Sequence, residues 1–243
     1  YVTVITGCNM ECTYCIVPAT RGRERSRPIA DVIREVESLV AQGYREITFL
    51  GQTVNAYGDD LEDPQANFTQ LLVETDRVFP QGRVRFLSAH PKKISDELIE
   101  VWPRITSLCE HVHLPVQSGS DRVLRRMKRL YTRDEYVRKV DALRKNVPGL
   151  AVTTDLIVGF PGETEEEFQE TLALCDAVQF DSAYMYIYSP RSGTAATRLK
   201  DPVPHAAALE RLDRLMDRQA RHARASLDRQ IGRRLDVLFE SVA

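Results

Sequence analysis

The sequence has no long apolar run and no strong excess of one charge, and both absences narrow what the protein can be. No window approaches the roughly 20 apolar residues of a membrane-spanning helix, so we expect no membrane partner. The 33 Lys and Arg are balanced by 35 Asp and Glu, a net charge of -2. Because the whole chain is not basic, local patches would have to hold any nucleic acid.

Cysteine is also scarce, with five in 243 residues. Five cysteines without an extracellular disulfide framework indicate a reducing compartment, so we expect a cytoplasmic protein. Three of them, Cys8, Cys12 and Cys15, lie within eight residues in the spacing C-x3-C-x2-C. This spacing allows three thiolates to converge on one inorganic group.

The cysteine triplet lacks a fourth ligand. A structural zinc site needs four protein ligands, and no second pair follows at zinc-finger spacing. A four-iron cluster is normally held by four cysteines, so three would leave one iron free to bind an exchangeable molecule. The spacing therefore favours an iron-sulfur cluster, with zinc as the second interpretation and a disulfide a distant third.

Short apolar runs alternate with helical patterns along most of the chain. This alternation predicts an α/β fold with a parallel sheet, and six units rather than eight predict an incompletely closed barrel. Polar and glycine-rich loops follow the strands, at the edge where such sheets build their sites. The six expected strands span residues 1–6, 47–50, 84–87, 112–116, 151–158 and 182–188.

The C-terminal part has a different pattern. From residue 204 a long helix is expected, with an apolar stripe that includes Leu209, Leu212 and Met216 and with arginines along another face. Residues 235–239 alternate like a short strand.

The cysteine triplet carries a family resemblance. With Tyr14 before the last cysteine, the pattern C-x3-C-x-aromatic-C resembles the signature of the radical S-adenosylmethionine (SAM) superfamily. The resemblance implies a (β/α)6 TIM-type barrel and a 4Fe-4S cluster held by Cys8, Cys12 and Cys15. It also implies that SAM binds the open iron and is cleaved to a 5′-deoxyadenosyl radical, which abstracts a hydrogen atom.

Four further segments, residues 51–58, 113–120, 155–163 and 188–194, resemble the radical SAM methylthiotransferases. The first two are most similar to the branch that methylthiolates C2 of N6-isopentenyladenosine beside the anticodon of tRNA. The ribosomal-protein branch typically has His where this chain has Ser118. The threonylcarbamoyladenosine branch usually lacks the pattern formed by Gln52 and Asn55.

The resemblance also implies SAM contacts. The glycine-rich loop would meet the methionine amino group, and Gln117, Arg129 and Asp155 would contact the carboxylate and the ribose hydroxyls, with the arginine suited to the carboxylate and Asp155 to the hydroxyls. The alternatives are a surface arginine and a strand acid bonded to backbone. The residues implied are Tyr14, Gly51, Gln52, Thr53, Ser88, Gln117, Arg129 and Asp155.

Two groups of arginines are candidate RNA contacts. Arg21, Arg23 and Arg25 alternate in the segment after the cysteines, and Arg211 and Arg218 belong to the expected long helix. A solvated loop and a helix face with mixed ion pairs are the alternatives.

We expect a radical SAM core in residues 1–231 and the start of a truncated TRAM domain in residues 232–243. The chain would then be a fragment, without the N-terminal domain that holds a second 4Fe-4S cluster in this family, and unable to complete methylthiolation alone. Expected partners are tRNA, SAM, a flavodoxin or ferredoxin electron donor and a sulfur donor, with the chain a monomer. The rivals are methylthiolation of a ribosomal-protein aspartate or of threonylcarbamoyladenosine, and a non-catalytic, metal-stabilised RNA-binding module.

Overall fold

Six parallel strands form the centre of the molecule in the computed structural model, which describes residues 1–239. Two three-stranded sheets, in the order β1-β4-β5 and β6-β7-β8, are joined by a parallel bridge between Val84 and Leu108. No ladder within residues 1–239 joins β8 to β1, so the predicted open barrel is confirmed. The strands are β1 (Val2–Thr3), β4 (Glu46–Leu50), β5 (Arg83–Phe86), β6 (His111–His113), β7 (Ala151–Val158) and β8 (Ser182–Ile187).

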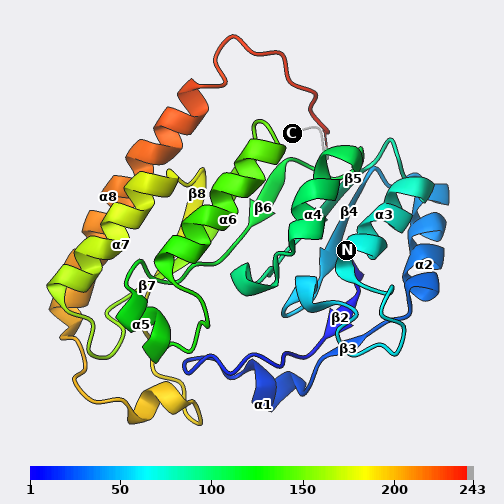
Figure 1. Cartoon of the computed structure of the whole chain (residues 1–243). Helices are drawn as coiled ribbons and strands as arrows, with labels where there is room; N and C mark the ends of the chain where they lie inside the picture. The colour runs from blue at the N-terminus through cyan, green and yellow to red at the C-terminus, as the bar shows by residue number, and fades with distance from the viewer. Residues whose placement is uncertain (240–243) are drawn as a thin grey trace.

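The helices between these strands follow one another in an arc, from α2 at the right of Figure 1 to α8 at the left. Two of them begin at a side-chain cap: the Ser95 side chain accepts from the Leu98 N–H, and Thr164 forms a capping box with Glu167. They are α2 (Ile29–Ala41), α3 (Phe68–Val78), α4 (Asp96–Val101), α5 (Asp121–Arg126), α6 (Arg133–Asn146), α7 (Glu165–Val178) and α8 (His205–Asp228).

Strand β7 shows how this arrangement positions a site. Its residues alternate strictly between buried and half-buried, with Val152, Thr154, Leu156 and Val158 buried. Because successive side chains of a strand point to opposite faces, the half-buried set faces the inside of the open barrel. Asp155 belongs to that inner set.

The N-terminal segment differs from the prediction in two ways. The expected strand over residues 1–6 is divided, because β2 (Ile5–Thr6) leaves the barrel and pairs antiparallel with β3 (Arg25–Ser26). Helix α1 (Val17–Arg21), with a proline in its first turn, lies at the start of the arginine-containing segment after the cysteines, where no helix was predicted. The pairing partner β3 is distant in sequence, so local pattern gave no sign of it.

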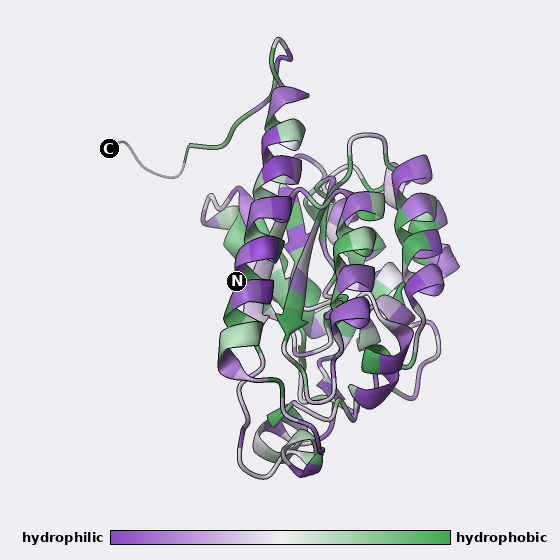
Figure 2. Cartoon of the chain, turned by 90° about the vertical axis from the view of Figure 1, so that its left-hand side faces the viewer, coloured by the Kyte–Doolittle hydropathy of each residue, from purple (hydrophilic) through white to green (hydrophobic). Residues whose placement is uncertain are grey.

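Helix α8 packs through a face that overlaps the predicted stripe only in part. Leu212 is half-buried and packs against the core, but Leu209 and Met216 are exposed, and the buried positions include Arg211, Leu215 and Gln219. Figure 2, which faces this side of the molecule, shows mostly hydrophilic residues along the outside of α8. No helix in residues 1–239 is both long and apolar enough to cross a membrane.

Four single-turn 3-10 helices complete the described structure: η1 (Val54–Ala56), η2 (Pro91–Lys93), η3 (Trp102–Arg104) and η4 (Ala195–Arg198). Residues 235–239 form neither helix nor strand, so the strand expected there is absent. The Asp236 carbonyl accepts from Arg83 Nη2 at 3.2 Å. The last four residues of the expected TRAM segment, 240–243, lie outside the described residues.

Candidate active site

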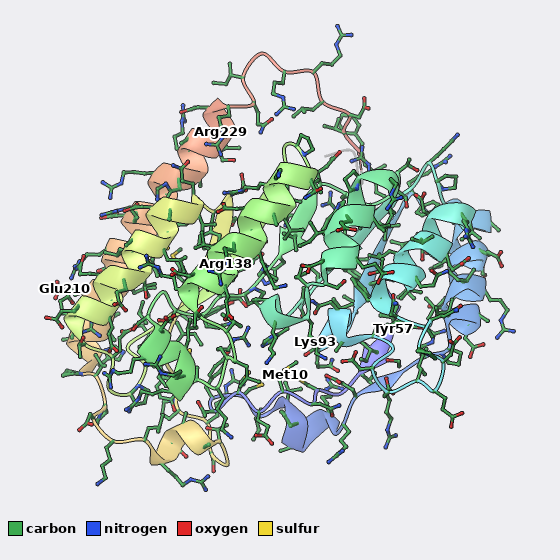
Figure 3. All side chains as sticks on the ribbon, in the orientation of Figure 1. Met10, Tyr57, Lys93, Arg138, Glu210 and Arg229 are labelled. Carbon is green, nitrogen blue, oxygen red and sulfur yellow. The ribbon has the colours of Figure 1, made fainter. Side chains whose placement is uncertain are left out.

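The three clustered cysteines lie on the loop between β2 and α1, where Met10 is labelled in Figure 3. Cys8 is buried, Cys12 and Cys15 are half-buried, and all three are free thiols. The loop is anchored at Gly7, whose N–H donates to Gln52 Oε1 at 2.6 Å. A Cβ on Gly7 would lie 2.0 Å from the Arg23 carbonyl oxygen, so only glycine fits this close approach.

All three cysteines line one cavity of about 350 Å³ at the carboxyl ends of the strands. Most of the residues implied to contact SAM line it too: Tyr14, Gln52, Thr53, Ser88, Gln117, Arg129 and Asp155. Gly51 does not, since it packs against Ile5, where an added Cβ would meet the side chain at 2.4 Å. The geometry therefore unites ten of the eleven predicted cluster and SAM residues around a single space.

Two of these residues have a strained backbone. Ser88, after β5, and Gln117, after β6, have φ of 62° and 75°. Non-glycine residues adopt this left-handed conformation at a cost of about 1–3 kcal/mol, and such strain is concentrated at functional sites. The left-handed conformation of Ser88 and Gln117 turns the chain at the two strand ends that line the cavity.

Donors surround the cysteine sulfurs. Thr53 Oγ1 lies 3.1 Å from Cys8 Sγ, and the Met10 N–H donates to the same sulfur at 3.3 Å. Arg129 Nη1 donates to Cys12 Sγ at 3.4 Å. Burial raises the pKa of the Cys15 thiol. Thr53, Met10 and Arg129 thus contact the sulfurs of Cys8 and Cys12.

The three cysteines are placed as an iron-sulfur cluster requires. No group of three or more His, Cys, Asp or Glu among residues 1–239 is arranged to hold a single ion. The cysteines nevertheless line one cavity. In a 4Fe-4S cluster each cysteine binds a different iron, so the sulfurs must surround the group rather than meet at one point. Cysteines spread around a space of this size fit that requirement.

Sequence reasoning missed two histidines that line the same cavity, His90 and His113. His113 Nε2 lies 3.5 Å from Asp155 Oδ1, and Nδ1 lies 3.0 Å from Thr153 Oγ1. Burial lowers the pKa of His90 to about 3, so its ring is neutral at physiological pH. Both residues belong to polar segments at strand ends, and this position could have identified them as candidates from the sequence.

A second cavity of about 370 Å³ adjoins the first, since Tyr14, Cys15, Val17, Gln117 and Asp155 line both. The rest of its lining is largely aliphatic and aromatic. Ile16 comes from the residue before α1, and the others come from the end of β7, from β8 and from the loop after it: Ile157, Tyr186, Ile187, Tyr188, Ser189 and Arg191. A flat, weakly polar group fits such a lining.

The candidate RNA contacts separate into two groups. Arg21, Arg23 and Arg25 are exposed around α1 and β3. Arg211 is only 8% exposed and donates to Glu163 Oε2 at 2.8 Å, so its prediction as an RNA contact is wrong. Arg218 is paired with Asp176 on α7. The buried Glu163 carboxylate requires a cation beside it, which the helical pattern alone did not reveal.

A family model matches this arrangement directly. The model, described as the Radical SAM superfamily, matches residues 2–175. The chain belongs to the radical SAM superfamily. This membership agrees with the cysteine triplet at the end of the first strands and with the six parallel β/α units that build the cavity.

Eight curated relatives of this radical SAM chain have the same name, tRNA-2-methylthio-N(6)-dimethylallyladenosine synthase. The protein from a Thermoanaerobacter species is 49% identical over 243 residues, which is 100% of this chain and 51% of the relative. The protein from Geobacillus kaustophilus is 50% identical over 240 residues, 99% of this chain and 45% of the relative. The chain thus spans about half the length of the curated relatives it matches.

Solved structures show the same fold at low sequence identity. The radical SAM methyltransferase TsrM from Kitasatospora setae, with cobalamin and a 4Fe-4S cluster bound, is similar with TM-score 0.63 at 21% identity over 76% of this chain and 36% of that one. Coproporphyrinogen III oxidase from Escherichia coli gives TM-score 0.62 at 16% identity over 91% of this chain and 52% of that one.

Proposed function

We propose that this chain holds one 4Fe-4S cluster through Cys8, Cys12 and Cys15 and binds SAM beside it. The observation that carries the proposal is the single cavity that unites the three cysteines with seven of the residues implied to contact SAM. When bound, such a cluster supplies one electron to SAM and so provides a radical able to take a hydrogen atom from an unactivated carbon. The protein supplies binding, orientation and exclusion of water.

The cavity gives each side chain a role toward SAM. Gln52 and Thr53 follow β4 and would meet the amino group, and Arg129 would hold the carboxylate through its remaining N–H groups. Gln117 and Asp155 line both cavities, which suits contact with the ribose hydroxyls in the middle of the molecule. The adenine would then lie in the second cavity, against Ile157 and Tyr188.

For the substrate, we propose C2 of N6-isopentenyladenosine in tRNA, which receives a methylthio group. The shared name of the relatives supports this choice, and the exposed Arg21, Arg23 and Arg25 offer phosphate contacts. An aromatic C2–H has no acidic proton, so its replacement by sulfur calls for radical chemistry. An electron donor such as flavodoxin or ferredoxin, a sulfur donor and a second cluster would come from outside these 243 residues.

The proposal extends to the oligomeric state and the cellular location of the protein. All five cysteines are free. Free thiols and a tRNA substrate favour a reducing compartment such as the cytoplasm, where we propose that the chain acts as a monomer. We further propose that residues 1–231 are the radical SAM core and that residues 232–243 begin a TRAM domain.

Anaerobic reconstitution with iron and sulfide tests the cofactor assignment. We expect about four irons per chain and formation of 5′-deoxyadenosine from SAM with dithionite, with both lost in Cys12→Ala. Cys109→Ala is the matched control and should retain both, because Cys109 does not line the cavity. Bound zinc in place of iron, or a full cluster that never cleaves SAM, would favour the RNA-binding module instead.

A further inference from the structure

Arg129 is a buried cation without a carboxylate partner. It is only 6% exposed, and it forms no ion pair with any Asp or Glu of the described chain. Its guanidinium instead donates from Nε to Tyr131 Oη at 2.9 Å, from Nη2 to the Pro115 carbonyl at 2.9 Å and from Nη1 to Cys12 Sγ at 3.4 Å. An unpaired buried charge is costly, so an anion must lie beside this group in the working protein.

The surrounding backbone holds Arg129 in this position. Lys128 and Leu130, on either side of it, both have left-handed φ, of 55° and 57°. Two strained residues flanking one arginine persist only where the surrounding structure imposes them. Tyr131 adds a second restraint, since its hydroxyl also donates to the Val116 carbonyl at 2.9 Å.

Cys12 Sγ, which accepts from Arg129 Nη1 at 3.4 Å, would become an anion on binding iron. A cysteine that ligates iron is a thiolate, and a thiolate carries no proton to donate. For the same reason the Thr53 hydroxyl must act as donor in its 3.1 Å contact with Cys8 Sγ. Two cluster ligands would thus each accept a side-chain hydrogen bond, one of them from a full positive charge.

We propose that Arg129 and Thr53 raise the reduction potential of the cluster bound by Cys8, Cys12 and Cys15. The inference rests on the proposed cluster. One-electron reduction adds negative charge to the cluster, and a fixed cation and hydrogen bonds at its sulfurs stabilise the reduced form more than the oxidised form. The low exposure of Arg129 strengthens this effect, because little water screens its charge.

This role is compatible with binding of the SAM carboxylate. A guanidinium has five N–H donors, and three are used by Tyr131, Pro115 and Cys12. Two donors remain for an anion in the cavity. The two roles separate experimentally, because the potential of the cluster can be measured in the absence of SAM.

The test is an EPR-monitored redox titration of the reconstituted cluster without SAM. In Arg129→Gln the ratio of reduced to oxidised cluster at a fixed ambient potential should fall at least about tenfold, or about 59 mV for a one-electron couple. Thr53→Val should shift the potential in the same direction by less, and Arg129→Lys should restore part of the loss. Arg138→Gln is the control, since this arginine is exposed on α6, does not line the cavity and should leave the potential unchanged.

Wild-type potential in an Arg129→Gln protein with full iron content would overturn the proposal and leave Arg129 as a SAM ligand alone. If Arg129→Gln takes up no iron, Thr53→Val decides the outcome, and an unchanged potential there overturns the proposal equally. A wild-type chain that assembles no cluster would instead refute the proposed function.

Discussion

Asn55 and Ser118, on which the expected resemblance to one branch of the family partly rests, do not line the candidate cavity. Asn55 brackets the backbone of His90, accepting from its N–H at 2.8 Å and donating to its carbonyl at 3.0 Å. Ser118 is fully buried and contacts Thr171 at 3.4 Å. These residues therefore shape the loops that carry cavity residues such as His90 and Gln117. At the scale of single residues, Asn55 and Ser118 can thus influence the cavity by holding loops in place, without lining it.

Gly7→Ala tests how closely the cysteine loop is constrained. The added methyl group would collide with the Arg23 backbone, so the loop must move. We expect a decrease of about 3 kcal/mol or more in unfolding free energy, combining left-handed strain with overpacking, and a marked fall in iron content after reconstitution. Urea denaturation and iron analysis measure the two effects.

Gly43→Ala is the matched control for Gly7→Ala. Gly43 also has a left-handed φ, of 90°, but an added Cβ would meet nothing within 4 Å. Gly43→Ala should lower the unfolding free energy by about 1 kcal/mol, because of left-handed strain, and leave the iron content unchanged. Equal destabilisation in both variants would show that the close approach at Gly7 has no effect of its own.

At the scale of elements, helix α8 is fixed to the barrel by the Glu163–Arg211 pair. The Glu163 side chain is fully buried, and it also accepts from the Gly159 N–H at 2.7 Å, in the loop after β7. The same arginine packs over the ring of Phe168 on α7. One buried pair thus connects the loop after β7 with α7 and α8, which explains why Arg211 faces inward.

Arg211→Met should destabilise the protein by about 3–5 kcal/mol at pH 7, because a buried carboxylate loses its cation. Burial already raises the folded-state pKa of Glu163 above its ordinary value near 4.5, and removal of the arginine raises it further. A raised folded-state pKa favours the folded state at low pH, and this contribution is lost as the pH rises through that pKa. The difference in unfolding free energy between wild type and Arg211→Met should therefore shrink as the pH falls toward 4.5.

Urea denaturation of wild type and variant at pH 7 and near pH 4.5 measures this change. Arg214→Met is the control, since Arg214 also packs over Phe168 but has a side chain 36% exposed and pairs with Glu165. It should cost less than about 1 kcal/mol at either pH. A pH-independent deficit for Arg211→Met would contradict the assignment to Glu163.

The segment from α1 to β3 carries the remaining basic candidates. Replacing Arg21, Arg23 and Arg25 together by Gln should weaken tRNA binding. It should also make the slope of log K against log salt concentration shallower, by roughly one unit for each phosphate that is no longer neutralised, up to about three. Filter binding over a range of salt concentrations gives both quantities.

A control for this triple variant removes the same charge elsewhere. Arg34, Arg77 and Arg104 are exposed on α2, α3 and η3. Their replacement by Gln should leave the salt slope near that of wild type. Equal slopes in both triple variants would mean that the α1–β3 segment does not bind the RNA.

At the scale of the whole molecule, three of the five cysteines line the candidate cavity and two lie elsewhere. Cys175 is fully buried on α7, where burial raises its pKa to about 12, and Cys109 is half-buried outside the cavity. Neither is placed to hold a second cluster beside the first.

We therefore expect the reconstituted chain to cleave SAM without forming methylthio-adenosine. Mass spectrometry of nucleosides from N6-isopentenyladenosine-containing tRNA, beside a 5′-deoxyadenosine assay, separates the two activities. Formation of methylthio-adenosine by these 243 residues alone would contradict the expectation that thiolation needs a second cluster.

The sequence by itself predicted the six β/α units and the clustering of three cysteines, because strand alternation and cysteine spacing are local patterns, and the family resemblance predicted ten of the sixteen residues that line the cavity. The tertiary structure decided the rest. The pairing of β2 with β3 and the burial of Arg211 opposite Glu163 join residues about 20 or more positions apart. The same holds for the contact of Arg129 with Cys12. Such contacts depend on which segments the barrel brings together, and no local periodicity encodes them.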